Sequence, residues 1–378
     1  MRRFTIVSGN YELAIFKLTG RMEIVLRRIK KMAALFWVGS QLLMCTACSN
    51  NTADTNSSAT EAREVVVHEN NNDINESAGM EMAEWPVFTA ESSVGEVLAD
   101  PAFKEIGHLL FPVDRTVSEN MTLADVSSSS VYVWYNNIQP DKTVEIINHL
   151  KNRVAGGQPI FYSIYSDEEI ASDPSKVNTG LFYFGGENGK PYAIMNAGGS
   201  FSYVGAMHDS FPHALEASKY GYNSFALIYR PDDPYSDLAK AIEYINNHAA
   251  ELGVDAEHYS LWGGSAGARM AAALGNADYL YQLTGNRDIP QADAVIMQYT
   301  GYNDYSQADA PTYVCVGTND GIASWHTMQA RLEMLDSLGI PTEFHSYDGL
   351  PHGFGLGTGT IAEGWFDDAI AFWEIQMN

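Results

Sequence analysis

The residues "LWGGSAGARM" (261–270) place one serine among glycines and alanines. An apolar run precedes them and a helix-forming run follows, so the serine stands where a strand turns into a helix. A Gly-x-Ser-x-Gly pattern in that position is typical of a tight turn that presents a nucleophilic serine. We therefore predict Ser265 as a nucleophile. The N–H of Ala266, unpaired at the helix start, is predicted to stabilise developing negative charge.

A serine hydroxyl needs a base to remove its proton, and the base needs an acid that orients it. His352 lies in the loop "YDGLPHGFGLGTGT" (347–360), between the last predicted strand and the final predicted helix. Asp320 follows the penultimate predicted strand and is the predicted acid. Asp348 is the alternative acid, but its closeness to His352 in the chain favours a role in the turn.

A site for an oxyanion is predicted from the run "AIMNAGGSFSYVG" (193–205). Gly198 and Gly199 follow a predicted strand there, where their backbone N–H groups can face the serine. Together with the N–H of Ala266 they would form an oxyanion hole, which is often the largest single catalytic contribution.

The elements that must position these residues alternate between short apolar runs and longer amphipathic ones from residue 159 onward. Strands are predicted at 160–166, 181–186, 192–196, 224–229, 259–263, 294–299, 312–317 and 342–347. Helices are predicted at 209–220, 235–252, 265–275, 324–338 and 361–376. This alternation predicts an α/β fold with a mostly parallel sheet of about eight strands and helices on both faces. The first two strands come before the alternation and predict an antiparallel start.

The first 47 residues read as a signal region of the lipoprotein type. A basic run (27–31) is followed by an apolar run (32–44) that is too short for a bilayer span. Thr46-Ala47-Cys48 then resembles a bacterial lipoprotein box, in which Cys48 is lipidated. This predicts an extracytoplasmic, membrane-anchored protein of a bacterial cell surface; an ordinary signal peptide and a secreted protein are the alternative.

Composition divides the rest of the chain into three parts. Residues 48–84 are polar and read as a disordered tether, and 85–157 read as an N-terminal extension or cap with helices at 95–110 and 141–155. The catalytic domain is predicted at 158–378. After residue 47 the chain has 14 basic and 45 acidic residues. That charge argues against nucleic acid and anionic lipid as partners, which leaves a lipid anchor at Cys48 as the predicted membrane contact.

The ordered motifs resemble the α/β-hydrolase superfamily, in particular its hormone-sensitive-lipase-like and acetyl-esterase branch. The resemblance covers about residues 180–378 and rests on "AGGSF", "GGSAGA", "GTNDGIAS" and "LPHGFG". The branch usually has His-Gly-Gly-Gly where this chain has Ala197-Gly198-Gly199-Ser200. The resemblance also implies that the pair His208-Asp209 caps and packs the following helix. A metal site built from His208, Asp209 and His213 is disfavoured by their spacing, so no metal or other cofactor is predicted.

These residues predict a serine esterase for short-chain carboxylic esters, such as acetyl or carbohydrate esters, with a small molecule or a glycan as the substrate. Only twelve residues separate the predicted strands 294–299 and 312–317, which leaves no room for the lid that many lipases insert there. A serine peptidase or acyltransferase on the same fold, or a surface binding protein without catalysis, remain as alternatives. Cys315, in an apolar strand, is predicted to be a buried structural thiol.

Overall fold

The computed structural model describes residues 86–112, 117–128 and 130–378, which belong to one compact unit, Met80–Asn378. The predicted signal region, the tether and Cys48 lie outside the described residues. None of the helices within the described ranges is long and apolar enough to cross a bilayer.

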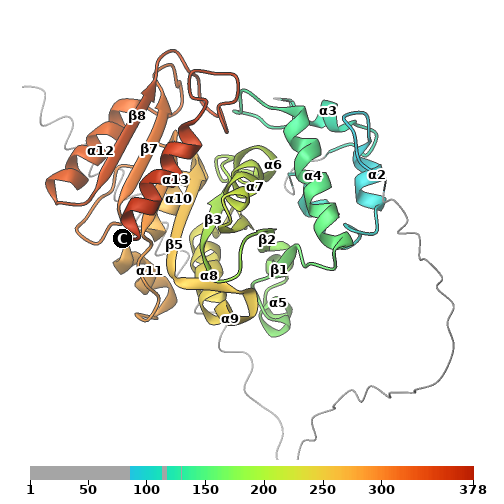
Figure 1. The fold of residues 1–378 in the computed structure, drawn as a ribbon, viewed down its shortest axis with the longest axis horizontal. Coiled ribbons are helices and arrows are strands. Elements are labelled where there is room, and N and C mark those ends of the chain that lie inside the picture. The colour runs from blue at the N-terminus through green and yellow to red at the C-terminus, as the bar shows by residue number, and fades with distance from the viewer. Residues whose placement is uncertain (1–85, 113–116, 129) are drawn as a thin grey trace, which may run out of the picture. The chain divides into compact units, whose positions relative to one another are not determined.

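An eight-stranded sheet forms the centre of the unit (Figure 1). Its strands are β1 (Phe161–Ser163), β2 (Gly180–Gly185), β3 (Lys190–Asn196), β4 (Asn223–Ile228), β5 (Val254–Gly264), β6 (Ala294–Gln298), β7 (Thr312–Gly317) and β8 (Thr342–Tyr347). Their order in the sheet is β1-β2-β4-β3-β5-β6-β7-β8. β2 pairs antiparallel with β1 and with β4, and all later pairs are parallel. The predicted strands, their mostly parallel pairing and the antiparallel start are thus confirmed.

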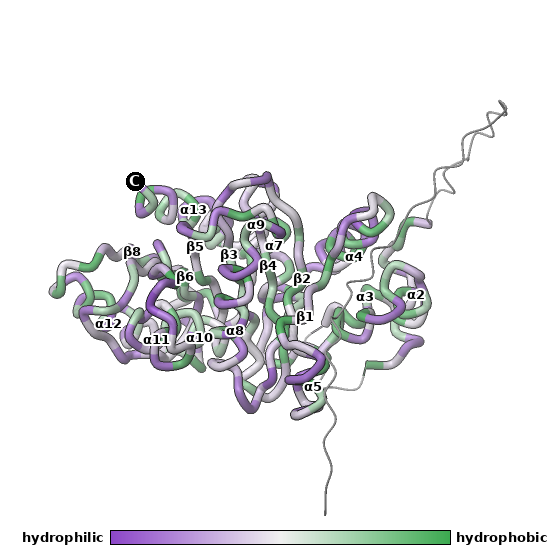
Figure 2. Tube along the Cα trace, turned by 90° about the horizontal axis from the view of Figure 1, so that it is seen from below, coloured by the Kyte–Doolittle hydropathy of each residue, from purple (hydrophilic) through white to green (hydrophobic). Residues whose placement is uncertain are grey.

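Helices cover both faces of the sheet, as predicted. The helices after β3 are α6 (Ala206–Asp209), α7 (Phe211–Lys219), α8 (Pro234–Asn247), α9 (Ala249–Leu252), α10 (Ala266–Leu274), α11 (Ala277–Thr284), α12 (Trp325–Ser337) and α13 (Trp365–Gln376). Figure 2 shows α8, α10 and α12 on one side of the sheet, and α7 and α13 on the other. Strands β2, β4, β6 and β7 are buried along their whole length because both faces are covered.

The described part of the extension is helical, but its first helix is shorter than predicted. It contains α2 (Val94–Ala99), a 3-10 turn η1 (Gly107–Leu109), α3 (Leu123–Val126) and α4 (Pro140–Ala155). α2 ends before Pro101, because the residue that precedes a proline is disfavoured in helical conformation, and Asp100 is extended with ψ 132°. A short helix α5 (Asp167–Ser172) and a 3-10 turn η2 (Pro174–Asn178) connect β1 to β2.

Candidate active site

Ser265 stands at a strained turn between β5 and α10, with φ 53° and ψ −115°. The flanking glycines make this turn possible. A Cβ atom at Gly267 would lie 1.9 Å from the carbonyl oxygen of Asn196, and one at Gly263 would lie 2.3 Å from the Gly267 backbone. Such close approach between strand and helix excludes any larger residue. The turn therefore has the geometry that the sequence pattern predicted.

A continuous line of hydrogen bonds connects Ser265, His352 and Asp320. The Nε2 atom of His352 is 3.1 Å from the Ser265 hydroxyl, and its Nδ1 atom is 2.7 Å from a carboxylate oxygen of Asp320. The imidazole is buried, with the His352 side chain 6% exposed. In this order the carboxylate fixes the proton on Nδ1, so that Nε2 is free to accept the serine proton.

The two candidate acids occupy different positions. The second carboxylate oxygen of Asp320 accepts the backbone N–H groups of Ile322 and Ala323, at 2.8 and 2.7 Å. These donors stabilise a negatively charged Asp320 in the orientation that contacts His352. Asp348 instead accepts the hydroxyl of Thr318 on the exposed turn after β8. The structure thus places Asp320, and not Asp348, against the histidine.

The predicted oxyanion donors need one correction. The N–H of Gly198 donates to a carboxylate oxygen of Asp209 at 2.7 Å, so it is not free to bind an oxyanion. Within the described residues, the N–H groups of Gly199, Ser200 and Ala266 have no acceptor. The free donors of this loop are therefore Gly199 and Ser200. Ser200 has the place of the third glycine in the branch pattern, where the backbone N–H persists although the side chain differs.

Asp209 is a buried carboxylate with three donors and a role that the sequence did not predict. Besides Gly198 it accepts the hydroxyl of Tyr135 at 3.0 Å and that of Tyr299 at 2.5 Å. Burial raises the pKa of Asp209 to about 6, and the three hydrogen bonds oppose that rise. The resemblance implied that this residue caps the next helix, but its carboxylate points to Gly198 and accepts no N–H of α7.

The two histidines next to Asp209 are neutral packing residues. Burial lowers the pKa of His208 to about 3 and that of His213 to about 4. His208 packs edge-on against Tyr132, and Nδ1 of His213 contacts the backbone carbonyl of Asp209. Across the residues with described positions, no three His, Cys, Asp or Glu side chains are placed to hold a metal ion. Cys315 is buried and free, as predicted.

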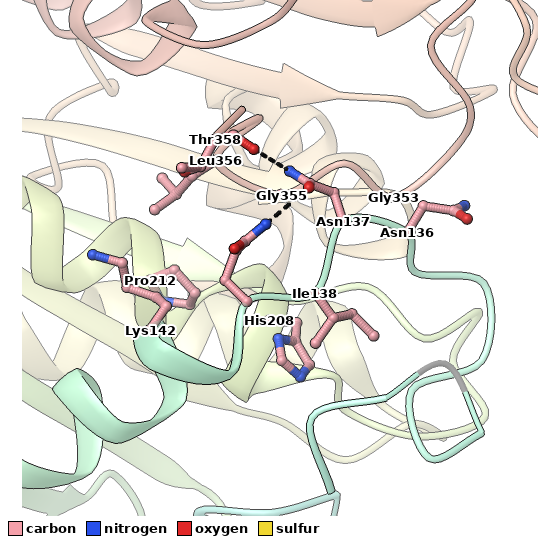
Figure 3. A pocket seen from close by; sticks show the side chains of 11 residues that line it. Asn136, Asn137, Ile138, Lys142, His208, Pro212, Gly353, Gly355, Leu356 and Thr358 are labelled. Atoms are coloured by element: carbon pink, nitrogen blue, oxygen red, sulfur yellow. Dashed lines mark hydrogen bonds between the residues drawn. The ribbon is translucent and has the colours of Figure 1, made fainter. Parts of the chain in front are cut away.

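The extension contacts the loop that carries His352. The side chain of Asn136 donates to the carbonyl of His352 at 2.7 Å, and its backbone N–H donates to Gly353. Figure 3 shows Asn137 reaching the carbonyl of Thr358, at 3.0 Å. The cavity in that view is only about 30 Å³, so it has room for water rather than for an ester substrate. The extension therefore braces the histidine loop from outside.

The extension also reaches residues 197–203, the loop after β3 that contains Gly198, Gly199 and Ser200 and that we call the oxyanion loop. The hydroxyl of Tyr203 donates to the carbonyl of Val133 at 2.6 Å, and its ring stacks on Trp134 at 6.0 Å. Tyr203 in turn closes the turn that begins at Gly199, whose carbonyl accepts its N–H. Residues 132–137 thus touch the oxyanion loop, Asp209 and the histidine loop. Nothing in the local sequence of the extension indicated these long-range contacts.

Comparisons with known proteins agree with this architecture. A family model named BD-FAE matches residues 207–322, which include Ser265 and Asp320. An acetyl ester-xyloside bifunctional hydrolase from Caldicellulosiruptor lactoaceticus has a TM-score of 0.50 at 18% identity, over 57% of this chain and 95% of that one. The similarity to this hydrolase and the strand order of the sheet together establish the fold of the chain. The chain has the α/β-hydrolase fold. The predicted superfamily is thereby confirmed, while the branch within it stays a prediction.

Further solved α/β hydrolases are similar to the chain. The thermophilic esterase Est2 of Thermogutta terrifontis has a TM-score of 0.48 at 19% identity, over 58% of this chain and 92% of that one. MGS-M1, an α/β hydrolase from a Medee basin deep-sea metagenome library, has a TM-score of 0.45 at 19% identity, over 53% and 93% of the two chains. Among curated proteins, no sequence matches the chain.

The α/β-hydrolase fold explains why distant residues meet at one point. Ser265 follows β5, Asp320 follows β7 and His352 follows β8. These strands run parallel, so their carboxyl ends lie at one edge of the sheet, together with the loop that follows β3. Loops at that edge are where open α/β sheets bind their ligands.

Proposed function

We propose that this protein is a serine esterase that hydrolyses short-chain carboxylic esters, including acetyl esters of a glycan or a small alcohol. The observation that carries the proposal is the line of hydrogen bonds from Asp320 through His352 to Ser265. The strained turn at Ser265 and the free N–H groups of Gly199 and Ser200 support it. So does the likeness to the acetyl ester-xyloside bifunctional hydrolase of Caldicellulosiruptor lactoaceticus.

In the proposed reaction the Ser265 oxygen attacks the ester carbonyl carbon while Nε2 of His352 takes the hydroxyl proton. The carbonyl oxygen becomes an oxyanion, which the N–H groups of Gly199, Ser200 and Ala266 bind. The C–O bond to the alcohol then breaks, and His352 returns the proton to the leaving alcohol. Water, activated by the same imidazole, hydrolyses the acyl-enzyme and restores the serine.

The acyl chain is expected to be short because no lid covers the site from the usual position. β6 ends at Gln298 and β7 begins at Thr312, and the loop between them contains no helix. A lipase lid needs an amphipathic segment that opens at a lipid surface. This connection has none.

A series of p-nitrophenyl esters from acetate to palmitate tests the proposed function. We expect kcat/KM to be highest for the shortest esters and to fall steeply with chain length, without a rise in rate when the substrate forms an emulsion. Ser265→Ala is the control for uncatalysed background. A preference for long-chain esters would contradict the substrate class, and turnover of peptide anilides without turnover of esters would favour a peptidase.

The location at a cell surface is also part of the proposal, and it depends on Cys48. We expect the mature chain to begin at a lipid-modified Cys48, because a basic run, a short apolar run and Thr46-Ala47 precede it. Mass spectrometry of the mature N-terminus and partitioning into detergent measure this. Cys48→Ser should shift the protein to the aqueous phase. The matched control, Cys45→Ser, should leave it in the detergent phase. An unmodified, freely secreted wild-type protein would overturn the prediction.

A further inference from the structure

Asp209 is a buried charge for which the triad mechanism has no use. Its side chain is 1% exposed, and no lysine or arginine in the described residues forms an ion pair with it. A buried, unpaired carboxylate is costly unless hydrogen bonds compensate it. Its three donors are the N–H of Gly198 and the hydroxyls of Tyr135 and Tyr299. Each donor comes from a different part of the chain.

The carboxylate lies directly against the backbone of the catalytic turn. A Cβ atom at Gly264, the residue before Ser265, would be 2.3 Å from an oxygen of Asp209. A Cβ atom at Gly198 would be 2.8 Å from the Cβ of Ser265 and 2.9 Å from the other Asp209 oxygen. The carboxylate therefore fills the space between the nucleophile turn and the start of the oxyanion loop.

The oxyanion loop needs such an anchor because its backbone is strained. Gly199, Ser200 and Phe201 have φ values of 127°, 57° and 54°, a conformation that side chains rarely adopt. Strained segments persist only where the surroundings hold them in place. The bond from Gly198 to Asp209 fixes the Ala197–Gly198 peptide. The next peptide carries the Gly199 N–H and is held through its Gly198 carbonyl, which accepts the N–H of Gly205 at 3.0 Å. Together these two bonds limit the directions in which the N–H groups of Gly199 and Ser200 can point.

We infer that Asp209 is a positioning residue of the oxyanion loop, and that Tyr135 and Tyr299 hold its carboxylate in place. Tyr135 makes this role depend on the extension, since residues 132–137 supply the donor from outside the hydrolase fold. The burial of both tyrosines keeps their pKa values well above the ordinary range, so they remain protonated donors. The inference rests on the proposed esterase function, because it assigns the loop a role in that reaction.

Asp209→Ala removes the acceptor and tests the inference. We expect kcat to fall about 10²-fold with KM changed less than about threefold, because the loop binds the oxyanion and not the ground-state ester. Asp209→Asn should recover most of the lost activity: its amide oxygen can still accept the Gly198 N–H, while its NH₂ donates to the Tyr299 oxygen. Recovery by the asparagine variant separates the hydrogen bond from the charge.

The extension's part is tested with Tyr135→Phe. Alone it should lower kcat several-fold; combined with Asp209→Ala it should add little, since the tyrosine acts through the carboxylate. Asn223→Ala is the matched control. Its buried side chain also makes three hydrogen bonds, but it lies at the start of β4, the opposite end of that strand from the site. It should lower the melting temperature and leave kcat unchanged.

Amide hydrogen exchange gives a readout that does not depend on turnover. Peptides that cover residues 197–201 should exchange faster in Asp209→Ala than in the wild type, and at the wild-type rate in Asn223→Ala. The positioning role would be overturned if Asp209→Ala left the exchange of this loop or kcat unchanged. It would also be overturned if Asp209→Ala changed KM and the melting temperature to the same extent as kcat. If the wild-type protein hydrolyses no ester, the proposed function fails, and exchange in the loop alone decides the role of Asp209.

Discussion

Ser265→Ala and His352→Ala are each expected to lower kcat by roughly 10⁶, and the double variant by little more. In the proposed reaction the serine supplies the attacking oxygen, and the histidine, 3.1 Å from it, supplies the base without which that oxygen is unreactive. Because the two residues act as one unit, removal of either one abolishes nearly the whole rate enhancement that the pair provides. Ester turnover under substrate saturation measures kcat, and the folded fraction is checked by circular dichroism.

Two matched variants separate this chemistry from general damage. Ser260→Ala removes a buried serine hydroxyl from β5, the strand that leads to Ser265, and leaves the indole N–H of Trp262 unpaired. It should lower stability by about 1–3 kcal/mol without loss of kcat. His258→Ala breaks another His–Asp contact, with Asp293, at a partly exposed position in β5. It should be active. Full turnover by Ser265→Ala would refute the proposed nucleophile.

Much of the fold was predictable because each strand carries its own signal. All eight strands were located from short apolar runs bounded by turn residues. These runs are nearly continuous because helices cover both faces of the sheet. The helix α11 was missed. It begins at Ala277, shortly after α10 ends, and its N-cap residue Asn276 accepts the backbone N–H of Tyr279 with its side chain. The turn between α10 and α11 is so short that the sequence indicates one amphipathic helix followed by a loop, instead of two helices.

The site was predictable where the chemistry is local and was not where it depends on distant contacts. The proposed roles of Ser265 and His352 are indicated by their immediate neighbours in the chain, the glycines around the serine and the Pro/Gly-rich loop around the histidine. The choice between Gly198 and Ser200 depends on a bond to Asp209, which lies eleven positions along the chain. The contribution of Tyr135 depends on packing between the extension and the sheet, and its sequence context has no feature that indicates it.

Asp320→Asn is expected to keep the fold and to lower kcat by roughly 10⁴, or about 5.4 kcal/mol in the activation barrier. The amide oxygen can still accept the N–H groups of Ile322 and Ala323, so the NH₂ group faces Nδ1 of His352. The imidazole must then keep its proton on Nε2, where it can no longer accept the serine proton. Asp348→Asn removes a charge on an exposed turn, where its amide oxygen can still accept the hydroxyl of Thr318, and it should retain nearly full activity. A crippled Asp348→Asn beside an active Asp320→Asn would reverse the assignment of the acid.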